Sequence, residues 1–406
     1  MSVIFHIDVN SAYLSWTAVE ELKNGGKRDL RKIPAIIGGD QKSRHGIVLA
    51  KSIPAKKYGI RTGEPVVNAF RKCPGLVTAS PDHKLYGRYS GRLMEFLKSY
   101  TPMIEQVSVD ECYMDFTENM KNYHSPVEGA MEIKNEVSRR FGFTVNIGIS
   151  NNKLLAKMAS DFEKPDKVHT LFPEEIQVKM WPLPVAELYM AGQSSVEILR
   201  KLGIFTIGEL AVMDPRLLEP HLKSHGRRLW EFANGIGNAA VEPEPGEAKG
   251  IGNSTTLSRD AVTEDEAKEV LERLAASVGR RLRNAGQKAK MLSVEIKYYN
   301  FESSSHQKQL ARATNRDEDI YEEAVLLFRE LWDETPIRLL GIRSSKLAEE
   351  NEPEQMTIFD PQFQFDPKRE KNKKINQALE KVRMKYGEGI VMSGSDIKGN
   401  VPDDKR

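Results

Sequence analysis

The segment QVSVDECYMDF, residues 106–116, sets two adjacent acids inside a run that alternates like a β-strand. Successive side chains of a strand point to opposite faces, so a regular strand here would bury either Asp110 or Glu111. Because an unpaired buried carboxylate is costly, the segment requires a cation, an arginine partner or a bend that exposes both acids to water. A surface hairpin and a metal or catalytic site both meet this requirement.

Length and composition indicate a multidomain globular protein. The chain has 406 residues, and at the usual size of about 100–200 residues per domain this predicts roughly two to four domains. No apolar run approaches the ~18 residues of a membrane span, and the N-terminal stretch is too short and polar for a secretory signal. We therefore expect a cytoplasmic protein without membrane contacts. Cys73 and Cys112 show neither metal-binding spacing nor a disulfide framework.

The small net charge of +2 conceals two basic stretches. Residues 40–72 carry a net charge of +6, and residues 277–316 carry +7. Two separated basic stretches favour a polyanion that is contacted in two places. Solvated basic faces without a partner are the alternative.

The first part of the chain alternates strands and helices. Residues 2–8 predict a buried strand that ends at Asp8, and residues 11–23 predict a helix with apolar residues at helical spacing. Beyond an insert at about 25–100, the pattern continues with one or two strands at 103–116, a helix at 125–141, a strand at 143–150 and a helix at 151–162. Without the insert this is a βαββαβ order plus one helix, the split βαβ arrangement of an antiparallel sheet with two helices on one face. Asp8 ends the first strand and the acid pair lies where the second and third strands meet, so a turn there can bring three carboxylates together.

The second part of the chain predicts further domains. Residues 167 to about 240 contain short helices, and the Pro/Gly/Glu-rich residues 241–248 have the composition of a linker. Residues 249–345 repeat the β-α-β-β-α-β pattern, with a capping box from Thr263 to Glu266 at the start of the first helix. The tail, residues 346–406, begins acidic and contains proline, so we expect it to be tethered rather than packed.

The three acids also limit the chemistry of a site. Carboxylates without a clustered histidine or cysteine favour a hard cation such as Mg²⁺. Two such ions about 4 Å apart stabilise the attacking and leaving oxygens of a phosphoryl displacement. This predicts a nucleotidyl transferase or a nuclease.

Five motifs in a fixed order carry a resemblance to a known family. They are HIDVNSAYLSWTAVE, VSVDECYMDF, NIGISNNKLLAKMASDFEKP, KGIGNSTTL and QMTIF. Together they resemble the Y-family translesion DNA polymerases of the bacterial DNA polymerase IV type, over nearly the whole chain. The resemblance implies an α+β right hand with a ferredoxin-like palm (1–24 and 76–166), small fingers (25–75), a helical thumb (167–240), a linker (241–248), a little finger (249–345) and a tail (346–406).

The resemblance implies a metal site at the acids. Asp8, Asp110 and Glu111 match the family's ligands for two Mg²⁺ ions, and the main-chain carbonyl of Val9 is expected on the nucleotide-side ion. The three acids, Asp8, Asp110 and Glu111, would be the catalytic residues.

Three further residues match substrate contacts of the family. Tyr13 matches the aromatic steric gate, whose ring would clash with the 2′-hydroxyl of a ribonucleotide, and Lys164 matches a lysine that reaches the triphosphate. Taken alone, Tyr13 also fits a helix core and Lys164 a solvated charge. Lys56 stands where the family has a triphosphate-binding arginine, and Ile53 where it has tyrosine. Lysine keeps the charge but loses the bidentate fork of arginine.

Two more departures concern the surroundings of the pocket. The thumb segment AGQSS keeps only Gly192 of a Gly-x-Gly turn that contacts phosphate in the family. Ala12 precedes the gate where a bulky aromatic is frequent, which predicts a roomier pocket floor.

The expected function is addition of dNMPs from dNTPs to a primer 3′ end on primer–template DNA, with low fidelity and without proofreading, by a monomer. A metal-dependent nuclease could use the same acids but needs neither a sugar gate nor a triphosphate lysine. A catalytically silent DNA-binding scaffold does not need the intact acids. A nucleotide cyclase could share the palm but not the little finger.

A short apolar motif lies in the polar tail. The segment EQMTIFD presents Gln355, Met356, Ile358 and Phe359, and it resembles the peptide by which bacterial polymerases dock on the sliding clamp. Packing against the little finger or against the following amphipathic segment KKINQALEKVRMKY is the alternative.

Overall fold

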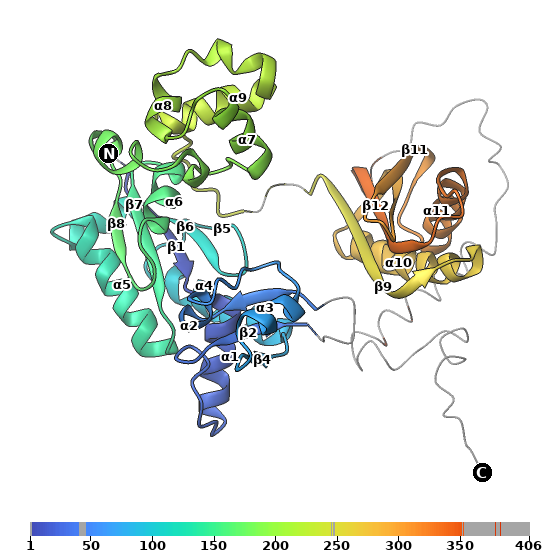
Figure 1. Ribbon diagram of the computed structural model, residues 1–406, viewed down its shortest axis with the longest axis horizontal. Helices are drawn as coiled ribbons and strands as arrows, with labels where there is room; N and C mark the ends of the chain where they lie inside the picture. The colour runs from blue at the N-terminus through green and yellow to red at the C-terminus, as the bar shows by residue number, and fades with distance from the viewer. Residues whose placement is uncertain are drawn as a thin grey trace. The chain divides into compact units, whose positions relative to one another are not determined.

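The computed structural model describes residues 2–39, 46–244, 246 and 248–350, together with the single residues 352, 378 and 382. The described chain combines helices with three β-sheets (Figure 1). This mixed architecture confirms the expected α+β fold class. No helix in the described ranges is long and apolar enough to cross a membrane. The expected clamp-binding residues lie outside the described residues; they are Gln355, Met356, Ile358 and Phe359.

The palm sheet has five strands in the order β5-β6-β1-β7-β8. The strands are β1 (Ile4–Val9), β5 (Ile104–Gln106), β6 (Glu111–Asp115), β7 (Val145–Ser150) and β8 (Val168–Thr170). β1 pairs antiparallel with β6 and β7, and β5 pairs antiparallel with β6, as the split βαβ pattern predicts. β8 pairs in parallel with β7, so the sheet extends beyond residue 166, where we ended the palm. Three residues are too few for a recognisable alternation.

Helices cover both faces of the palm sheet. One face packs against three helices, which are α1 (Ala12–Lys23), α4 (His83–Lys98) and α5 (Pro126–Phe141). The other face packs against α6 (Lys153–Asp161), where Ala156 meets Ile4 and Tyr113. Because side chains alternate along β1, Asp8 lies on the same face as Ile4 and therefore on the α6 side.

A glycine allows α6 to approach the sheet closely. A Cβ at Gly148 of β7 would lie 2.0 Å from the carbonyl oxygen of Ala156 and 2.4 Å from the amide nitrogen of Ser160. The helix therefore rests on the backbone of β7, and any larger residue at this position would push it away.

The segment predicted to form the fingers, residues 25–75, contributes to a small three-stranded sheet in the order β3-β2-β4, whose last strand lies beyond residue 75. Its elements are β2 (Ala35–Gly38), β3 (Val48–Lys51), α2 (Ile53–Lys56), α3 (Val66–Lys72) and β4 (Val77–Ala79). Ile36, Val48 and Val66 belong to its core. Ser52 caps α2, because its Oγ accepts the N–H of Ala55 at 3.1 Å.

The segment predicted to form the thumb, residues 167–240, contains three helices and several single turns. The helices are α7 (Gln193–Lys201), α8 (Ile207–Val212) and α9 (Glu219–Ala233). The turns are η2 (Pro173–Glu175), η3 (Ile176–Met180), η4 (Val185–Glu187) and η5 (Pro215–Leu217), whereas η1 (Thr117–Asn122) lies earlier in the chain, between β6 and α5 of the palm. The hydrophobic core of the helices α7 to α9 includes Leu199 and Leu210 and is shared with Leu155 and Met158 of α6. α6 thus connects the palm sheet to the thumb.

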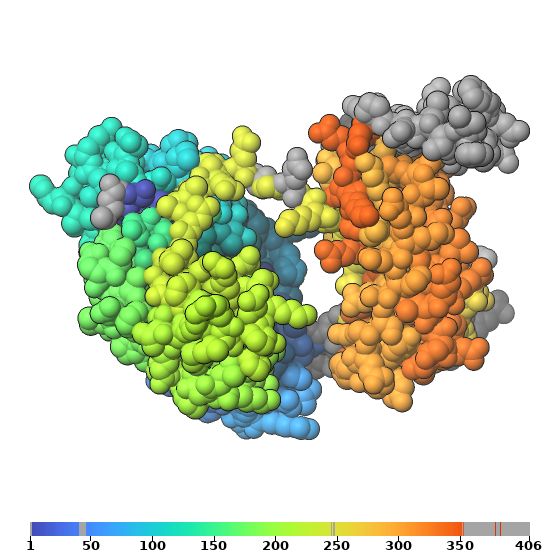
Figure 2. Space-filling view, turned by 90° about the horizontal axis from the view of Figure 1, so that it is seen from above, coloured from blue at the N-terminus to red at the C-terminus, as the bar shows by residue number. Residues whose placement is uncertain are grey.

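The little finger has its own core, and in Figure 2 its residues are coloured yellow to red. Its elements follow the expected order: β9 (Gly250–Ala261), α10 (Glu264–Asn284), β10 (Gln287–Tyr298), β11 (Ser303–Thr314), α11 (Asp317–Leu331) and β12 (Ile337–Glu349). The strand order is β11-β10-β12-β9, so here the first strand lies at an edge, whereas β1 lies inside the palm sheet.

The predicted cap of α10 is present with one difference. Thr263 Oγ1 accepts the N–H of Glu266 at 3.3 Å, but the Glu266 carboxylate accepts the N–H of Val262 rather than that of Thr263. α10 and α11 cover one face of the sheet. The other face carries a groove of about 1220 Å³, whose lining includes Ser293 and Arg343.

Candidate active site

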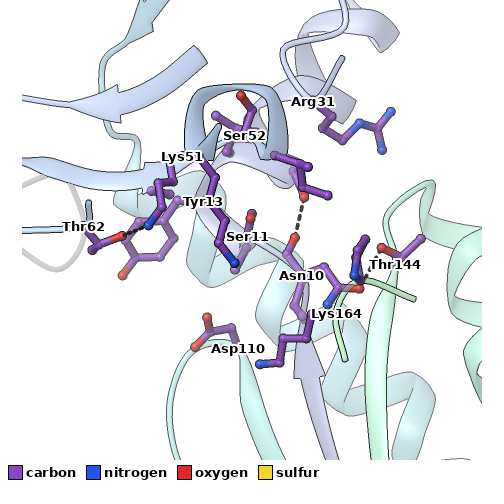
Figure 3. Close-up of a pocket in the computed structure, with 18 of the residues that line it drawn as sticks. Asn10, Ser11, Tyr13, Arg31, Lys51, Ser52, Thr62, Asp110, Thr144 and Lys164 are labelled. Atoms are coloured by element: carbon purple, nitrogen blue, oxygen red, sulfur yellow. Dashed lines mark hydrogen bonds between the residues drawn. The ribbon is translucent and has the colours of Figure 1, made fainter. Parts of the chain in front are cut away.

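A pocket of about 680 Å³ lies where the end of β1 and the start of α1 meet the fingers. Figure 3 shows side chains from the palm and the fingers around it. Nearly all of the predicted catalytic and substrate-binding residues line it, namely Asp8, Val9, Tyr13, Lys56, Asp110 and Lys164. Glu111 does not line the pocket. It faces the α6 side of the sheet, where Lys157 binds it.

The pairing of β1 with β6 brings the three acids together in the backbone. Asp8 is the register partner of Glu111, and the N–H of Val9 donates to the carbonyl of Asp110 at 3.1 Å. β5 ends at Gln106 and β6 begins at Glu111, so Asp110 lies in the turn between them. The expected bend is therefore present, and it frees Asp110 from the alternation of the strand.

Ser108 holds this turn in shape, a role that the sequence analysis missed. Its Oγ donates to Asp110 Oδ1 at 2.7 Å and accepts the N–H of Glu111 at 3.1 Å. A serine two residues before an aspartate is a local turn signal that could have identified it.

Lysine side chains neutralise the two acids that face α6. Lys164 Nζ contacts Asp8 Oδ2, and Lys157 Nζ donates to Glu111 Oε1 at 2.9 Å. Burial raises the pKa of Asp8, although the charge of Lys164 opposes the shift. Burial lowers the pKa of Lys157, but its contacts with Glu111 and Asp161 and the charge of Asp8 together outweigh this effect and leave the pKa raised. Both lysines are therefore charged at neutral pH.

His6 is a buried polar residue beside the acids. Its Nδ1 shares a hydrogen bond of 2.8 Å with Ser160 Oγ, and its Nε2 lies 3.9 Å from Glu111 Oε2. Burial, reinforced by the charges of Lys157 and Lys164, lowers the pKa of His6 well below its usual value. The ring is therefore neutral and adds no positive charge to the site.

The acids fit a cation by chemistry and charge. Within the described ranges no group of three or more His, Cys, Asp or Glu side chains is gathered closely enough to share a metal ion. However, the three acids sit on adjacent backbone positions, and ammonium groups already balance the two that face α6. Carboxylate oxygens that attract cations in this way match the donors that Mg²⁺ prefers.

The loop that carries Lys164 is fixed by two asparagines. Asn146 Nδ2 donates to the carbonyl of Glu163 at 2.7 Å, and Asn10 Oδ1 accepts the N–H of Asp166 at 2.9 Å. Asn10 and Asn146 are themselves joined at 3.0 Å. The backbone on both sides of Lys164 is thereby tied to β7 and to the residue that follows β1.

Tyr13 enters the pocket from the first turn of α1. The Tyr13 ring stacks on the ring of Tyr86 in α4, with the two centroids 4.2 Å apart. The ring of His83 lies perpendicular to the Tyr13 ring, with the two centroids 6.0 Å apart. Tyr86 Oη shares a 3.2 Å hydrogen bond with Thr17, whose hydroxyl also donates to the carbonyl of Tyr13 at 2.8 Å. Tyr86 was not predictable as the partner of Tyr13, because nothing in the sequence of α4 indicates which of its aromatic residues faces α1.

The fingers bring two lysines to the pocket rather than one. Besides Lys56, the pocket lining includes Lys51, whose Nζ donates to Thr62 Oγ1 at 3.2 Å. Burial and the neighbouring charge of Lys56 lower the pKa of Lys51. Ile53, which takes the place of the family's tyrosine, is about half exposed, at 49%. Lys51 belongs to the basic stretch at 40–72, and its sequence position alone does not indicate a role in the pocket.

Comparison with known proteins identifies the family. The model described as the impB/mucB/samB family matches residues 7–161, and the model of that family's C-terminal domain matches residues 248–358. The chain belongs to the impB/mucB/samB family. The two matches span β1 to α6 and the whole of the β9–β12 sheet with its two helices.

Individual relatives agree with this assignment. DNA polymerase IV of Clostridium acetobutylicum is 47% identical over 390 residues, which cover 96% of this chain and 97% of that protein. DNA polymerase IV 1 of Bacillus subtilis is 37% identical over 398 residues, 98% of this chain and 93% of that protein. A solved Y-family DNA polymerase chimera shares the fold, with a TM-score of 0.74 at 22% identity over 86% of this chain and 99% of its own.

These matches confirm the predicted recognition as a Y-family enzyme resembling DNA polymerase IV. They also confirm the enzyme class, a DNA-directed DNA polymerase. Y-family DNA polymerases generally depend on a divalent metal ion.

Proposed function

We propose that this chain extends a primer 3′ end with deoxynucleotides opposite a template, as a translesion DNA polymerase with low fidelity and without proofreading. The observation that carries the proposal is the pocket, in which Asp110, Tyr13 and Lys164 lie around one space of about 680 Å³ (Figure 3). Small-molecule sites commonly have volumes of about 300–1,000 Å³. The pocket combines acids for metal ions, an aromatic ring for a sugar and cations for a triphosphate.

In this proposal Asp8, Asp110, Glu111 and the main-chain carbonyl of Val9 hold two Mg²⁺ ions. When bound, such ions stabilise the charge on the attacking and leaving oxygens of an in-line phosphoryl transfer. The acids are suited to this role because two neighbouring strands and the Ser108-bound turn hold their backbone in place.

Positive side chains orient the triphosphate from two sides of the pocket. Lys164 comes from the palm, and Lys51 and Lys56 come from the fingers. Lysines act as point charges, so they neutralise phosphate without the bidentate geometry of an arginine. Lys56 keeps the charge of the family's arginine, and Lys51 adds a second positive charge on the same side of the pocket.

The Tyr13 ring excludes ribonucleotides by occupying the space of a 2′-hydroxyl. The Tyr86 stack supports this role, since a ring that is packed on its far side cannot swing away. Ala12 beside it leaves the floor of the pocket without a second bulky ring.

The proposal includes three further features of the enzyme. Primer–template DNA contacts the open face of the little finger, where polar residues such as Ser293 and Arg343 can touch the backbone without reading sequence. The tail docks on a sliding clamp through Gln355, Met356, Ile358 and Phe359. The enzyme acts as a cytoplasmic monomer.

A primer-extension assay tests the proposal. A labelled primer on undamaged and abasic templates is incubated with the full chain, Mg²⁺ and dNTPs, and a polymerase lengthens the primer. A shortened primer would instead favour the nuclease, and an unchanged primer with normal DNA binding would favour the silent scaffold. Omitting Mg²⁺ is the matched control and should stop extension.

A further inference from the structure

One carboxylate outside the predicted acid set touches both lysines of the site. Lys164 Nζ lies 2.8 Å from Asp161, and Lys157 Nζ lies 3.4 Å from it. The same two lysines contact Asp8 and Glu111. Asp161 is therefore the shared partner through which the two ion pairs are joined.

The position of Asp161 follows from the helix. Asp161 is one helical turn after Lys157 on α6, so their side chains lie on the same side, and Lys164 follows in the fixed loop. The side chain of Asp161 is 46% exposed, whereas that of Asp8 is 10% exposed. A lysine that moves from Asp8 to Asp161 therefore moves from the buried acids toward solvent.

The lysines and a metal ion compete for the same oxygens. An ammonium group in contact with a carboxylate neutralises it and repels a cation that approaches the same oxygens. Metal binding at Asp8 and Glu111 therefore requires Lys164 and Lys157 to withdraw. Within the described part of the chain, Asp161 is the remaining carboxylate that both already contact.

We propose that Asp161 is a positioning residue that receives Lys157 and Lys164 when the acids bind metal ions. By binding the two lysines, Asp161 lowers the free energy needed to move them away from Asp8 and Glu111. It also keeps Lys164 close to the triphosphate. This inference rests on the proposed function, because it takes Asp8 and Glu111 as metal ligands.

Binding of Mn²⁺ alone to the full chain, without DNA or nucleotide, measures this role. Asp161→Asn should weaken Mn²⁺ binding by about threefold to tenfold, because the lysines then have only the metal-binding acids as partners. Asp161→Glu should restore most of the affinity. Glu163→Gln is the matched control: it removes the same charge two residues away, where the carboxylate pairs with Lys167 at 3.4 Å.

A double-mutant cycle separates this role from simple loss of charge. Lys157→Met should tighten Mn²⁺ binding, and in that background Asp161→Asn should have a clearly smaller effect. Steady-state kinetics should show a raised KM for dNTP in Asp161→Asn, with an unfolding temperature close to that of the parent. An equal loss of affinity in both backgrounds, or no loss in Asp161→Asn, would overturn the inference.

Asp8→Asn distinguishes failure of the metal site from failure of the positioning role of Asp161. If Mn²⁺ binding does not depend on Asp8, the metal site of the proposed function is wrong. If Asp8→Asn abolishes binding while Asp161→Asn binds like the parent, only the positioning role of Asp161 fails.

Discussion

The ring of Tyr13 lies nearly parallel to the ring of Tyr86, with centroids 4.2 Å apart and 8° between the planes. The two residues belong to different helices, α1 and α4, and Tyr86 is almost completely buried. A stacked pair of this kind contributes about 0.5–1.5 kcal/mol beyond the burial of its area. The stack therefore holds the Tyr13 ring at the edge of the pocket.

Removing the Tyr13 ring should admit ribonucleotides. We expect Tyr13→Ala to reduce discrimination against rNTPs by about 10²-fold or more, since the barrier is steric and disappears with the ring. Single-nucleotide incorporation kinetics with dNTP and rNTP provide the measurement. Tyr13→Phe keeps the ring and should discriminate like the parent. Unchanged discrimination in Tyr13→Ala would refute the gate.

Loss of one metal-binding carboxylate should abolish extension while DNA binding survives. We expect Asp110→Asn to reduce the extension rate by about 10²-fold or more, because the amide cannot replace a charged metal ligand. Asp115→Asn is the control, since Asp115 lies at the other end of β6, where its carboxylate accepts the N–H of Thr117. Near-normal extension by Asp110→Asn would show that the metal assignment is wrong.

A methyl group at Gly148 should destabilise the protein and disturb the site together. Gly148→Ala places a Cβ against the backbone of α6, so we expect a loss of at least about 1–3 kcal/mol in the free energy of unfolding. Denaturant unfolding monitored by circular dichroism measures it. Gly87→Ala in α4 is the matched control, because nothing lies within 4 Å of a Cβ there, and it should be neutral or slightly stabilising. Equal stability of Gly148→Ala and the parent would contradict the close contact.

The tail peptide should serve the sliding clamp and not the chemistry. Ile358→Ala combined with Phe359→Ala should leave basal extension intact but remove stimulation by the clamp, because both apolar anchors are lost. Tethering raises the effective concentration of an enzyme whose own grip on DNA is sensitive to salt. A binding titration in which the double variant and the parent have equal clamp affinity would rule out this role.

Several features were predictable because their causes are local. The apolar run that ends at Asp8 predicted β1, and two adjacent acids in an alternating segment predicted the bend before Glu111. Thr263 was recognisable as a helix cap because capping acts over a few residues. The short strand β8 was not predictable, since three residues show no periodicity. The hydrogen bond of the Glu266 carboxylate was not predictable either, since a carboxylate can accept from either of two neighbouring N–H groups.

The order of strands and helices can be read from the sequence alone, and so can the acids at the end of β1 and at the β6 turn and, through the motifs, the family. These follow from hydrophobic period, turn chemistry and the spacing of motifs along the chain. By contrast, the packing of Tyr86 on Tyr13 and the ion pair of Lys157 with Glu111 follow from the three-dimensional arrangement of the helices and the sheet. These contacts join residues that are far apart in sequence, and a helical period identifies a buried face without identifying the partner that covers it. The close contact of α6 with Gly148 determines which partners Lys157 and Asp161 have. In a rigid helix, the rise and rotation per residue set which charged side chains reach the sheet.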